Sequence, residues 1–280
     1  MNYPPKISII TPSYNQGQFI EETILSVIKQ NYTNIEYLIV DGGSTDNTLE
    51  IIKKYEHRIT YWVIEKDNGQ SDAINKGFKK ATGDIICWIN SDDILMPNAL
   101  KTIANYFNNN KDVGLANGYT LRIDQNSNIL YNHFILKQKH FYARNGLYYL
   151  AQPSMFWRKG ILDEIGLIRE DFHAQMDKEF LIRVFQKGIK IGRINKILAA
   201  IRIHEDSKTY INGNIWQNDS IKIKSIYGKK YGLSPNIVIK SLYGVEKLLK
   251  LLYFKQIIFS MKWKGKKVDE LNANNCIYIR

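Results

Sequence analysis

Residues 85–93, which decide the fold, read Ile-Ile-Cys-Trp-Ile-Asn-Ser-Asp-Asp. The apolar half predicts a buried strand, and the polar half places an amide, a hydroxyl and two adjacent carboxylates directly after it. Oxygen groups of this kind at the carboxyl end of a strand are the ligands that hard divalent cations prefer. Because acidic pairs also form turns and helix caps, the flanking sequence must decide between a metal site and a turn.

The same order of apolar strand and polar loop occurs three times before this stretch. We expect strands at residues 7–10, 37–40 and 59–65, separated by helices at 19–30, 47–55 and 70–80. Such alternation predicts a mostly parallel sheet with right-handed crossovers, whose strands end at one rim. Four polar clusters should therefore meet there: residues 13–15, 41–44, 67–72 and 90–93.

The second half of the chain follows a less regular pattern. We expect a helix at residues 99–109, strands within 113–123, a hairpin turn at 124–128, a strand at 152–158 and a short helix at 160–166. Another helix begins at Met176, and residues 189–203 indicate an extended strand pair. The aromatic segment 132–150 suits a lid or acceptor wall, and equally a packed loop.

Length and composition indicate one large core, or one main domain with an appendage, because the 280 residues are 44% hydrophobic and 24% charged. The two cysteines, Cys87 and Cys276, have no ligand spacing, so neither a zinc site nor a disulfide framework is expected. The sequence shows no secretory signal and no apolar run of roughly 18 to 20 residues. We expect a cytoplasmic protein, either soluble or peripheral on the inner face of the cell membrane.

The positive charge is concentrated near the C-terminus. From Ser220 onward, 13 basic and 3 acidic side chains carry +10 of the formal net charge of +12. Residues 243–267 interleave lysines with apolar side chains, a pattern that favours an anionic membrane surface or a packing helix with a solvated basic face. Lysines beside tyrosines could also contact nucleic acid, but this charge lies outside the expected cleft, so no nucleic-acid partner is expected.

The glycine-containing loop that starts at Asp41 excludes two common nucleotide-binding patterns. It reads Asp-Gly-Gly-Ser, and it lacks both the Gly-x-Gly-x-x-Gly of dinucleotide binders and the Gly-Lys-Ser/Thr of phosphate-cradling loops. Hydride transfer and kinase chemistry therefore lose support. A single carboxylate here could accept a base N–H or a ribose hydroxyl, or the segment could be a turn that ends in a helix cap.

Five motifs together resemble those of family 2 inverting glycosyltransferases with the GT-A fold. They are residues 9–15 (Ile-Ile-Thr-Pro-Ser-Tyr-Asn), 40–46 (Val-Asp-Gly-Gly-Ser-Thr-Asp), 83–84 (Gly-Asp), 90–93 (Asn-Ser-Asp-Asp) with Pro97, and 177–183 (Asp-Lys-Glu-Phe-Leu-Ile-Arg). The resemblance covers residues 6 to about 207. It implies a Rossmann-like, mixed but mostly parallel sheet flanked by helices.

From this resemblance we expect a GT-A domain over residues 1–218, followed by a basic helical C-terminal segment over 219–280. The nucleotide-sugar half should span about residues 1–118, and the acceptor half about 119–218. The resemblance assigns donor binding to one set of residues: Pro12, Ser13, Tyr14, Asp41, Gly43, Asp72, Asn90 and Ser91. Two departures affect this set, since Gly42 replaces the family's usual second aspartate and Ile74 replaces a frequent arginine.

The resemblance also implies a metal site and a general base. Asp92, Asp93 and His204 would hold Mn²⁺ or Mg²⁺, with Asn90 in place of the first carboxylate of the family's Asp-x-Asp motif. Asp177 matches the general base, although Met176 replaces the glutamate that usually precedes it.

Four further residues have structural or acceptor-contacting roles in this scheme. Glu179 and Arg183 stand at ion-pair spacing on a helix and should hold it in place. Trp157 could stack on the acceptor sugar or pack in the core. Gln152 is a further candidate for an acceptor contact.

The function implied is transfer of a sugar from a nucleotide diphosphate sugar, with a UDP-sugar favoured. The acceptor would be a hydroxyl of a glycan or lipid-linked molecule, and the transfer would be inverting, metal-dependent and part of bacterial surface polysaccharide biosynthesis. One alternative is a non-catalytic nucleotide-sugar-binding protein of the same fold, because Gly42, Asn90 and Met176 depart from the family pattern. The other is a basic nucleic-acid-binding protein, on the basis of the lysines and tyrosines near the C-terminus.

Overall fold

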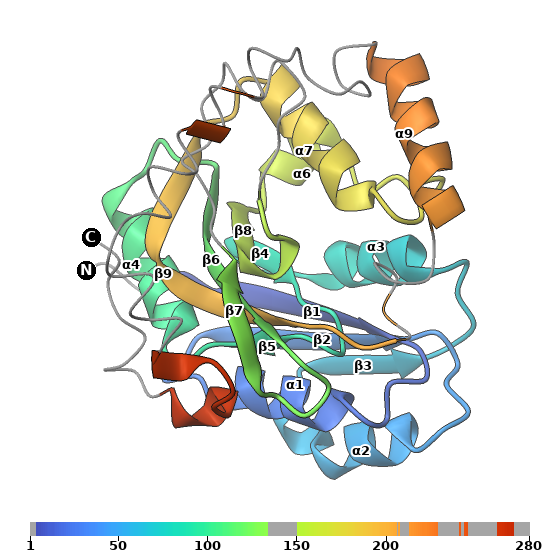
Figure 1. Ribbon diagram of the computed structural model, residues 1–280, viewed down its shortest axis with the longest axis vertical. Helices are drawn as coiled ribbons and strands as arrows, with labels where there is room; N and C mark the ends of the chain where they lie inside the picture. The colour runs from blue at the N-terminus through green and yellow to red at the C-terminus, as the bar shows by residue number, and fades with distance from the viewer. Residues whose placement is uncertain are drawn as a thin grey trace.

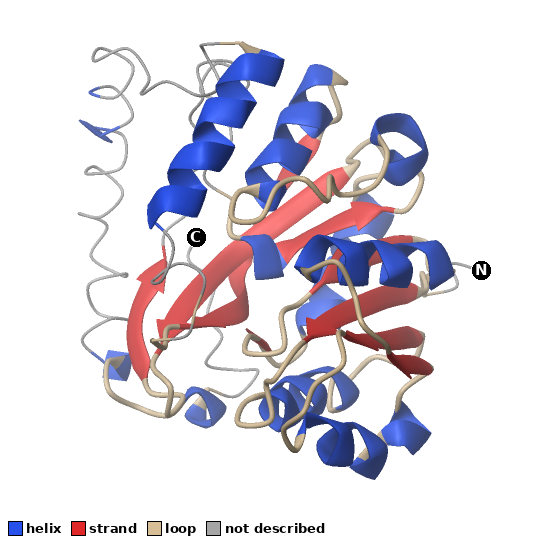
Figure 2. Ribbon diagram, turned by 90° about the vertical axis from the view of Figure 1, so that its right-hand side faces the viewer, coloured by secondary structure: helices blue, strands red, loops and turns tan. Residues whose placement is uncertain are grey.

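The computed structural model describes residues 4–133, 150–205, 207, 213–228, 241, 244–245 and 262–271. Within them, nine strands form one sheet with helices on both faces (Figures 1 and 2). The expected lid or acceptor wall lies outside the described residues from 134 to 149, as does most of the basic segment 243–267.

The first half forms the parallel part of the sheet, as the alternating pattern predicts. Its strands are β1 (Ile7–Ser13), β2 (Ile35–Asp41), β3 (Tyr61–Ile64) and β4 (Ile85–Trp88), and its helices are α1 (Ile20–Ile28), α2 (Thr48–Lys54) and α3 (Gln70–Lys80). A short 3₁₀ helix, η1 (Glu56–Arg58), follows α2. Strand β1 pairs in parallel with both β2 and β4, so the polar loops after these strands share one rim.

The second half extends the sheet with mixed pairing. Its elements are β5 (Ile94–Leu95), α4 (Ala99–Asn109), β6 (Leu115–Ile123), β7 (Ile129–His133), η2 (Gln152–Ser154), β8 (Met155–Arg158), α6 (Ile161–Ile165), α7 (Met176–Gln186), β9 (Ile191–Arg202) and α9 (Gly213–Tyr227). The sheet order is β3-β2-β1-β4-β8-β6-β9-β5, and β7 forms the expected hairpin with β6.

Two expectations about strands are wrong. Residues 189–203 form one long strand, β9, instead of a strand pair, because β9 stays parallel to β6 through register shifts near Tyr119 that let it curve. Residues 152–154 form the 3₁₀ helix η2, so the expected strand at 152–158 begins only at Met155.

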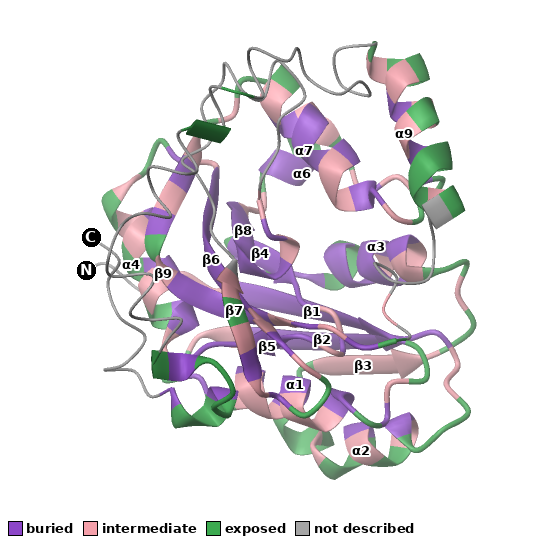
Figure 3. Ribbon diagram, viewed as in Figure 1, coloured by how far each residue is buried: buried purple, intermediate pink, exposed green. Residues whose placement is uncertain are grey.

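Alternating side chains of the strands form a core on each face of the sheet. The central strands are accordingly coloured as buried along most of their length (Figure 3). Ile7 and Ile9 of β1 point to the cluster that includes α1 and α4, whereas Ile10 points to the cluster that includes α3, α6 and α7. Trp157 is fully buried in the second cluster between Trp88 and Phe180. It therefore packs in the core and does not stack on an acceptor.

Residues 262–271 pack against the β6–β7 hairpin and include the 3₁₀ helix η3 (Val268–Glu270). Trp263, Val268 and Leu271 are buried with hairpin residues in a third core cluster. The Ile129 N–H donates to the Lys266 carbonyl at 2.8 Å. The expected boundary at 218/219 falls inside α9, and the division into a GT-A domain and a basic helical C-terminal segment stays a prediction. In the described part of the chain, no helix is long and apolar enough to span a membrane.

Glu36 joins β2 to its neighbours at the rim opposite the polar loops. Its carboxylate accepts hydrogen bonds from Lys6 Nζ (2.7 Å), Ser8 Oγ (2.5 Å), and the N–H (2.7 Å) and Oγ1 (2.6 Å) of Thr82. Burial disfavours the charged form, but these hydrogen bonds outweigh it and lower the pKa of Glu36 to about 2. The ionised carboxylate therefore stabilises the fold.

We expect Glu36→Gln to lower the free energy of unfolding at neutral pH by about 1.5–3 kcal/mol, since it weakens charged hydrogen bonds. Because the folded pKa is depressed, the stabilisation is present above the unfolded pKa of about 4.3 and is lost as pH falls toward 2. Urea unfolding across this range should show a flatter pH dependence for the variant than for the wild type. The exposed Glu50→Gln is the control, and equal stability of the Glu36 variant and wild type would contradict the assignment.

Candidate functional site

A cavity of about 800 Å³ opens along the rim where the parallel strands end. Its wall includes Pro12, Ser13 and Tyr14 from the end of β1 and the loop after it, Gly42 and Gly43 after β2, Lys66 and Asp67 after β3, Asn90 to Asp93 after β4, and His204 after β9. Most of the predicted site residues thus share one cavity. Asp41, Asp72 and Asp177 do not line it.

The first-strand loop gives the cavity one polar and one aromatic group. Ser13 is almost fully buried, and its Oγ has no hydrogen-bond partner among the residues that the structure describes. Tyr14 is 59% exposed at the cavity wall, where its ring is accessible to a ligand. A buried hydroxyl without a partner costs free energy unless a ligand or water satisfies it, so Ser13 is suited to ligand contact.

Asp41 shapes its own loop and does not reach the cavity. It is fully buried, and its Oδ1 accepts from the N–H groups of Gly43 (3.0 Å) and Ser44 (2.7 Å). Its Oδ2 accepts from Ser44 Oγ at 2.7 Å. These bonds fix the turn in which Gly43 has a φ of +89°, a conformation that favours glycine. Both carboxylate oxygens of Asp41 are thus bonded inside its own loop, and its expected contact with a ligand stays a prediction.

The Asp72 side chain likewise forms its contacts within α3 and the loop directly before it. Its Oδ2 accepts from the Asn68 N–H at 3.0 Å and lies 3.5 Å from Lys76 Nζ. This carboxylate in the first turn of α3 favours the helix N-terminus, so its expected role in donor binding is not supported by its position.

The strongest metal-binding candidates are Asp92 and His204. His204 Nε2 lies 3.0 Å from Asp92 Oδ2, and the imidazole packs on Phe19 with ring centroids 4.7 Å apart. His204 is 7% exposed, and its buried Nδ1 has no hydrogen-bond partner within the described part of the chain. A carboxylate beside an imidazole fits Mn²⁺ or Mg²⁺ if diphosphate and water oxygens complete the coordination, because the described residues contain no cluster of three or more His, Cys, Asp or Glu ligands.

Asp93 and Asn90 support this pair through internal hydrogen bonds. Asp93 Oδ1 accepts from the Arg202 N–H at 3.1 Å, and Asn90 Nδ2 donates to Asp93 Oδ2 at 3.3 Å. Gln70 Nε2 donates to Asn90 Oδ1 at 2.8 Å. Burial and the charge of Asp92 raise the pKa of Asp93. Asp93, predicted as a metal ligand, thus anchors β9 to the loop after β4.

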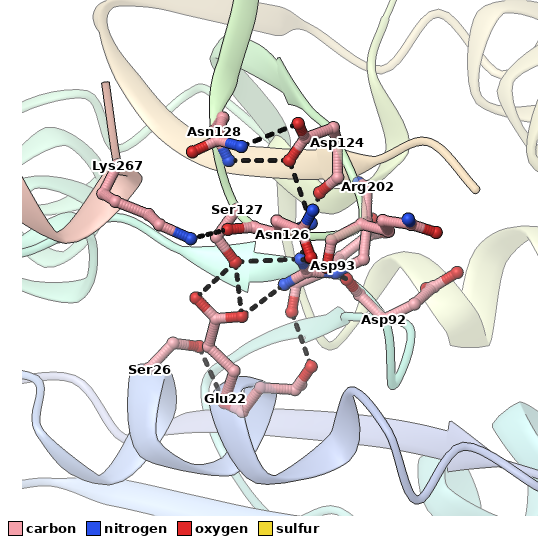
Figure 4. A network of polar contacts seen from close by, with 12 residues as sticks. Glu22, Ser26, Asp92, Asp93, Asp124, Asn126, Ser127, Asn128, Arg202 and Lys267 are labelled. Atoms are coloured by element: carbon pink, nitrogen blue, oxygen red, sulfur yellow. Dashed lines mark hydrogen bonds and ion pairs between the residues drawn. The ribbon is translucent and has the colours of Figure 1, made fainter. Parts of the chain in front are cut away.

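Arg202 is a functional residue to which sequence reasoning gave no role, although it lies two positions before His204. Its Nε donates to the Asp92 carbonyl at 2.9 Å, and its other guanidinium nitrogens contact Glu22 at 2.5 Å and Ser127 Oγ at 2.9 Å (Figure 4). The guanidinium also stacks over Phe19 at 4.8 Å. Arg202 therefore joins α1, the hairpin turn and the Asp92 loop.

Asp177 lies in the first turn of α7, next to the start of α3. Ser71 of α3 donates to the Phe172 carbonyl at 3.3 Å and contacts Met176 Sδ at 3.0 Å, while its neighbour Gln70 lines the cavity. Burial raises the pKa of Asp177. The hydrogen bond from the Lys178 backbone N–H and the positive charge of the Lys178 side chain lower it, but burial has the larger effect. A carboxylate with a raised pKa beside a cleft is suited to proton transfer.

Glu179 and Arg183 hold α7 in place as expected. Arg183 Nη2 and Glu179 Oε2 form an ion pair at 2.8 Å, and Arg183 also donates to carbonyls of the loop after α6. Gln152 donates to the Trp88 carbonyl at 2.7 Å, so in this structure its amide nitrogen contacts the core strand β4.

The loop that leads to Asp177 is held by a carboxylate of α9. Asp219 is 4% exposed, and its Oδ2 accepts from three consecutive N–H groups, those of His173 (3.1 Å), Ala174 (2.7 Å) and Gln175 (2.9 Å). Gln175 donates back to the Trp216 carbonyl at 2.6 Å. One buried oxygen thus fixes the backbone directly before α7.

We expect Asp219→Ala to loosen this loop, since three N–H groups, of which that of Gln175 is buried, lose their acceptor. The free energy of local opening for residues 173–175 should fall by about 1–3 kcal/mol. Hydrogen exchange followed by mass spectrometry would measure it, with the exposed Asp163→Ala on α6 as the control. Unchanged exchange at residues 173–175 would mean that Asp219 does not hold the loop.

Comparisons with known proteins agree with this geometry. The model of the family described as glycosyl transferase family 2 matches residues 8–166. An uncharacterized glycosyltransferase of Rickettsia typhi, RT0329, is 40% identical over 223 residues, which cover 74% of this chain and 67% of that protein. A putative teichuronic acid biosynthesis glycosyltransferase of Bacillus subtilis, TuaG, is 40% identical over 95 residues, which cover 33% of this chain and 38% of TuaG.

Two solved structures share the fold at low sequence identity. Staphylococcus aureus TarS 1–349 in complex with UDP-GlcNAc superposes with a TM-score of 0.59 and 18% identity, over 78% of this chain and 66% of that one. The mannosyltransferase PcManGT of Pyrobaculum calidifontis, in complex with GDP-Man and Mn²⁺, gives a TM-score of 0.54 and 15% identity over 93% and 84%. With the GT-A fold shared and the family model matching more than half of its length, the chain belongs to glycosyl transferase family 2.

Proposed function

We propose that this chain transfers a sugar from a nucleotide diphosphate sugar, with a UDP-sugar favoured, to a hydroxyl of a glycan or lipid-linked acceptor, with inversion. The observation that carries the proposal is the Asp92–His204 pair, 3.0 Å apart, on the wall of a cavity bounded by the loops of four parallel strands. The complexes of TarS with UDP-GlcNAc and of PcManGT with GDP-Man and Mn²⁺ support this proposal.

The donor would lie along the strand ends. Asp92 and His204 would hold Mn²⁺ or Mg²⁺, which would supply positive charge to the diphosphate as it leaves. Ser13 and Tyr14 would contact the nucleoside, and Arg202 would keep the Asp92 loop in register with β9 through its bonds to the Asp92 carbonyl and Asp93.

Asp177 would act on the acceptor. The acceptor hydroxyl oxygen attacks the anomeric carbon, the bond from that carbon to the diphosphate oxygen breaks, and the hydroxyl proton passes to the Asp177 carboxylate. Inversion follows because attack and departure occur on opposite faces of the sugar, without a covalent enzyme intermediate. A partly buried carboxylate with a raised pKa is a stronger base than an exposed one, which suits this role.

Two observations support the proposed acceptor: the similarity to TuaG and the positive charge of the C-terminal segment. The similarity to TuaG supports a place in bacterial surface polysaccharide biosynthesis. The +10 charge from Ser220 onward would favour peripheral attachment to the anionic inner face of the cell membrane, where lipid-linked acceptors reside. Residues 262–271 contribute side chains to the core of the domain. The C-terminal segment would then attach that domain to the membrane.

Asp177→Asn should lower the rate of sugar transfer by roughly 10²- to 10⁴-fold, because the amide cannot take the acceptor proton. Its KM for the donor should stay close to that of the wild type, since Asp177 lies outside the donor cavity. Steady-state transfer assays across UDP-, GDP- and dTDP-sugars with a glycan acceptor would measure both constants.

The matched control is Asp163→Asn, an exposed carboxylate on α6. The wild-type rate should decline as pH falls through the raised pKa of Asp177, because only the ionised carboxylate accepts a proton. Near wild-type transfer by Asp177→Asn would refute the base assignment. Donor binding without transfer or hydrolysis by the wild type would favour the non-catalytic alternative.

A further inference from the structure

Strand order indicates which end of the cavity receives the nucleoside. The sheet runs β3-β2-β1-β4-β8, with the Asp92 loop after β4. Helix α7, which carries Asp177 in its first turn, packs over β4 and β8 through Phe180, which contacts Trp88 and Trp157. If Asp177 is the base, the transferred sugar therefore belongs on that side. The nucleoside, on the other side of the diphosphate, then falls over the ends of β1, β2 and β3.

At that end, the carboxylate within reach of a ligand is Asp67. Asp67 lines the cavity, and its Oδ1 accepts from the Gly69 N–H at 2.8 Å. Its Oδ2 has no hydrogen-bond partner in the described part of the protein. Asp41, by contrast, is fully buried with both oxygens bonded inside its own loop. A carboxylate with one oxygen fixed and one free is pre-oriented to accept a hydrogen bond.

Gly42 makes this placement of Asp67 possible. A Cβ at residue 42 would lie 2.5 Å from Asp67 Oδ2 and 3.0 Å from its Cγ. The Asp67 carboxylate therefore occupies the space that any side chain at residue 42 would fill. Ser13, with its buried and unpartnered Oγ, lines the same cavity.

We propose that Asp67 Oδ2 recognises the nucleobase by accepting a hydrogen bond from its ring N–H, and that the lack of a side chain at Gly42 leaves room for this carboxylate. This inference rests on the proposed function. Uracil and thymine present an imide N–H on the Watson–Crick edge, whereas cytosine presents a ring nitrogen that only accepts. The Asp67 carboxylate, which only accepts, thus selects UDP or dTDP over CDP.

Binding of UDP and CDP to Asp67→Asn tests the selection. The affinity for UDP should fall on the order of ten- to hundredfold, because a charged hydrogen bond is replaced by a neutral one. The affinity for CDP should be retained or should rise, since the new amide can donate to the cytosine ring nitrogen. Isothermal titration calorimetry with Mn²⁺ present would measure both, with the exposed Glu65→Gln on the same loop as the control.

A pair of variants at Gly42 tests the spatial part of the inference. Gly42→Ala should displace the Asp67 carboxylate and weaken UDP binding as Asp67→Asn does. The double variant Gly42→Asp with Asp67→Gly places a carboxylate in the same space from the neighbouring loop, and it should recover UDP binding at least in part. Thermal unfolding would show that each variant is folded.

The outcomes separate this inference from the proposed function. Wild-type protein that binds no nucleoside diphosphate would overturn both. Wild-type protein that binds UDP, together with an Asp67→Asn variant that keeps its UDP affinity, would overturn the role of Asp67 alone. An equal loss of UDP and CDP affinity would also overturn base reading, since it would place Asp67 on the ribose or the diphosphate.

Discussion

The buried guanidinium of Arg202 is the group on which the Asp92–His204 end of the cavity depends. Charge removed from water must be compensated by hydrogen bonds, and Arg202 finds them on α1, on the hairpin turn and on the Asp92 carbonyl. Strand β9 ends at Arg202, and His204 follows two residues later. The hydrogen bonds that fix Arg202 therefore also place the His204 imidazole beside Asp92. Lys267 donates to the Asn126 carbonyl of this turn, so residues far apart in sequence support one loop (Figure 4).

The carboxylates of the rim divide into two groups according to their partners. The carboxylate oxygens of Asp41, Asp93 and Asp219 accept hydrogen bonds from backbone N–H groups or neighbouring side chains. These bonds fix the loops around the cavity and before α7. Asp92 and Asp67 each keep an oxygen directed to a ligand or an imidazole. The buried acids thus hold the backbone in place, and in the function proposed here the partly exposed acids would contact ligands, which is the preorganisation that a transfer reaction requires.

Much of the fold follows from the sequence, because alternation of apolar strands and amphipathic helices is a local signal. The parallel half and its shared rim could be predicted in this way. The single strand β9 could not, since its length depends on pairing with β6. The different surroundings of Asp41 and Asp67 could not be predicted from the sequence either. Each follows a strand in the sequence, and only the tertiary approach of Asp67 to Gly42 shows which carboxylate faces the cavity.

The central claim is that the rim cavity binds a nucleotide diphosphate sugar with a divalent cation. Thermal unfolding in the presence of UDP-, GDP- or dTDP-sugars, each with and without Mn²⁺, tests it directly, because a ligand that binds only the folded state raises the unfolding temperature. The account predicts that a UDP-sugar raises this temperature and that Mn²⁺ increases the rise, whereas the metal alone has little effect. No stabilisation by any of these donors would contradict it.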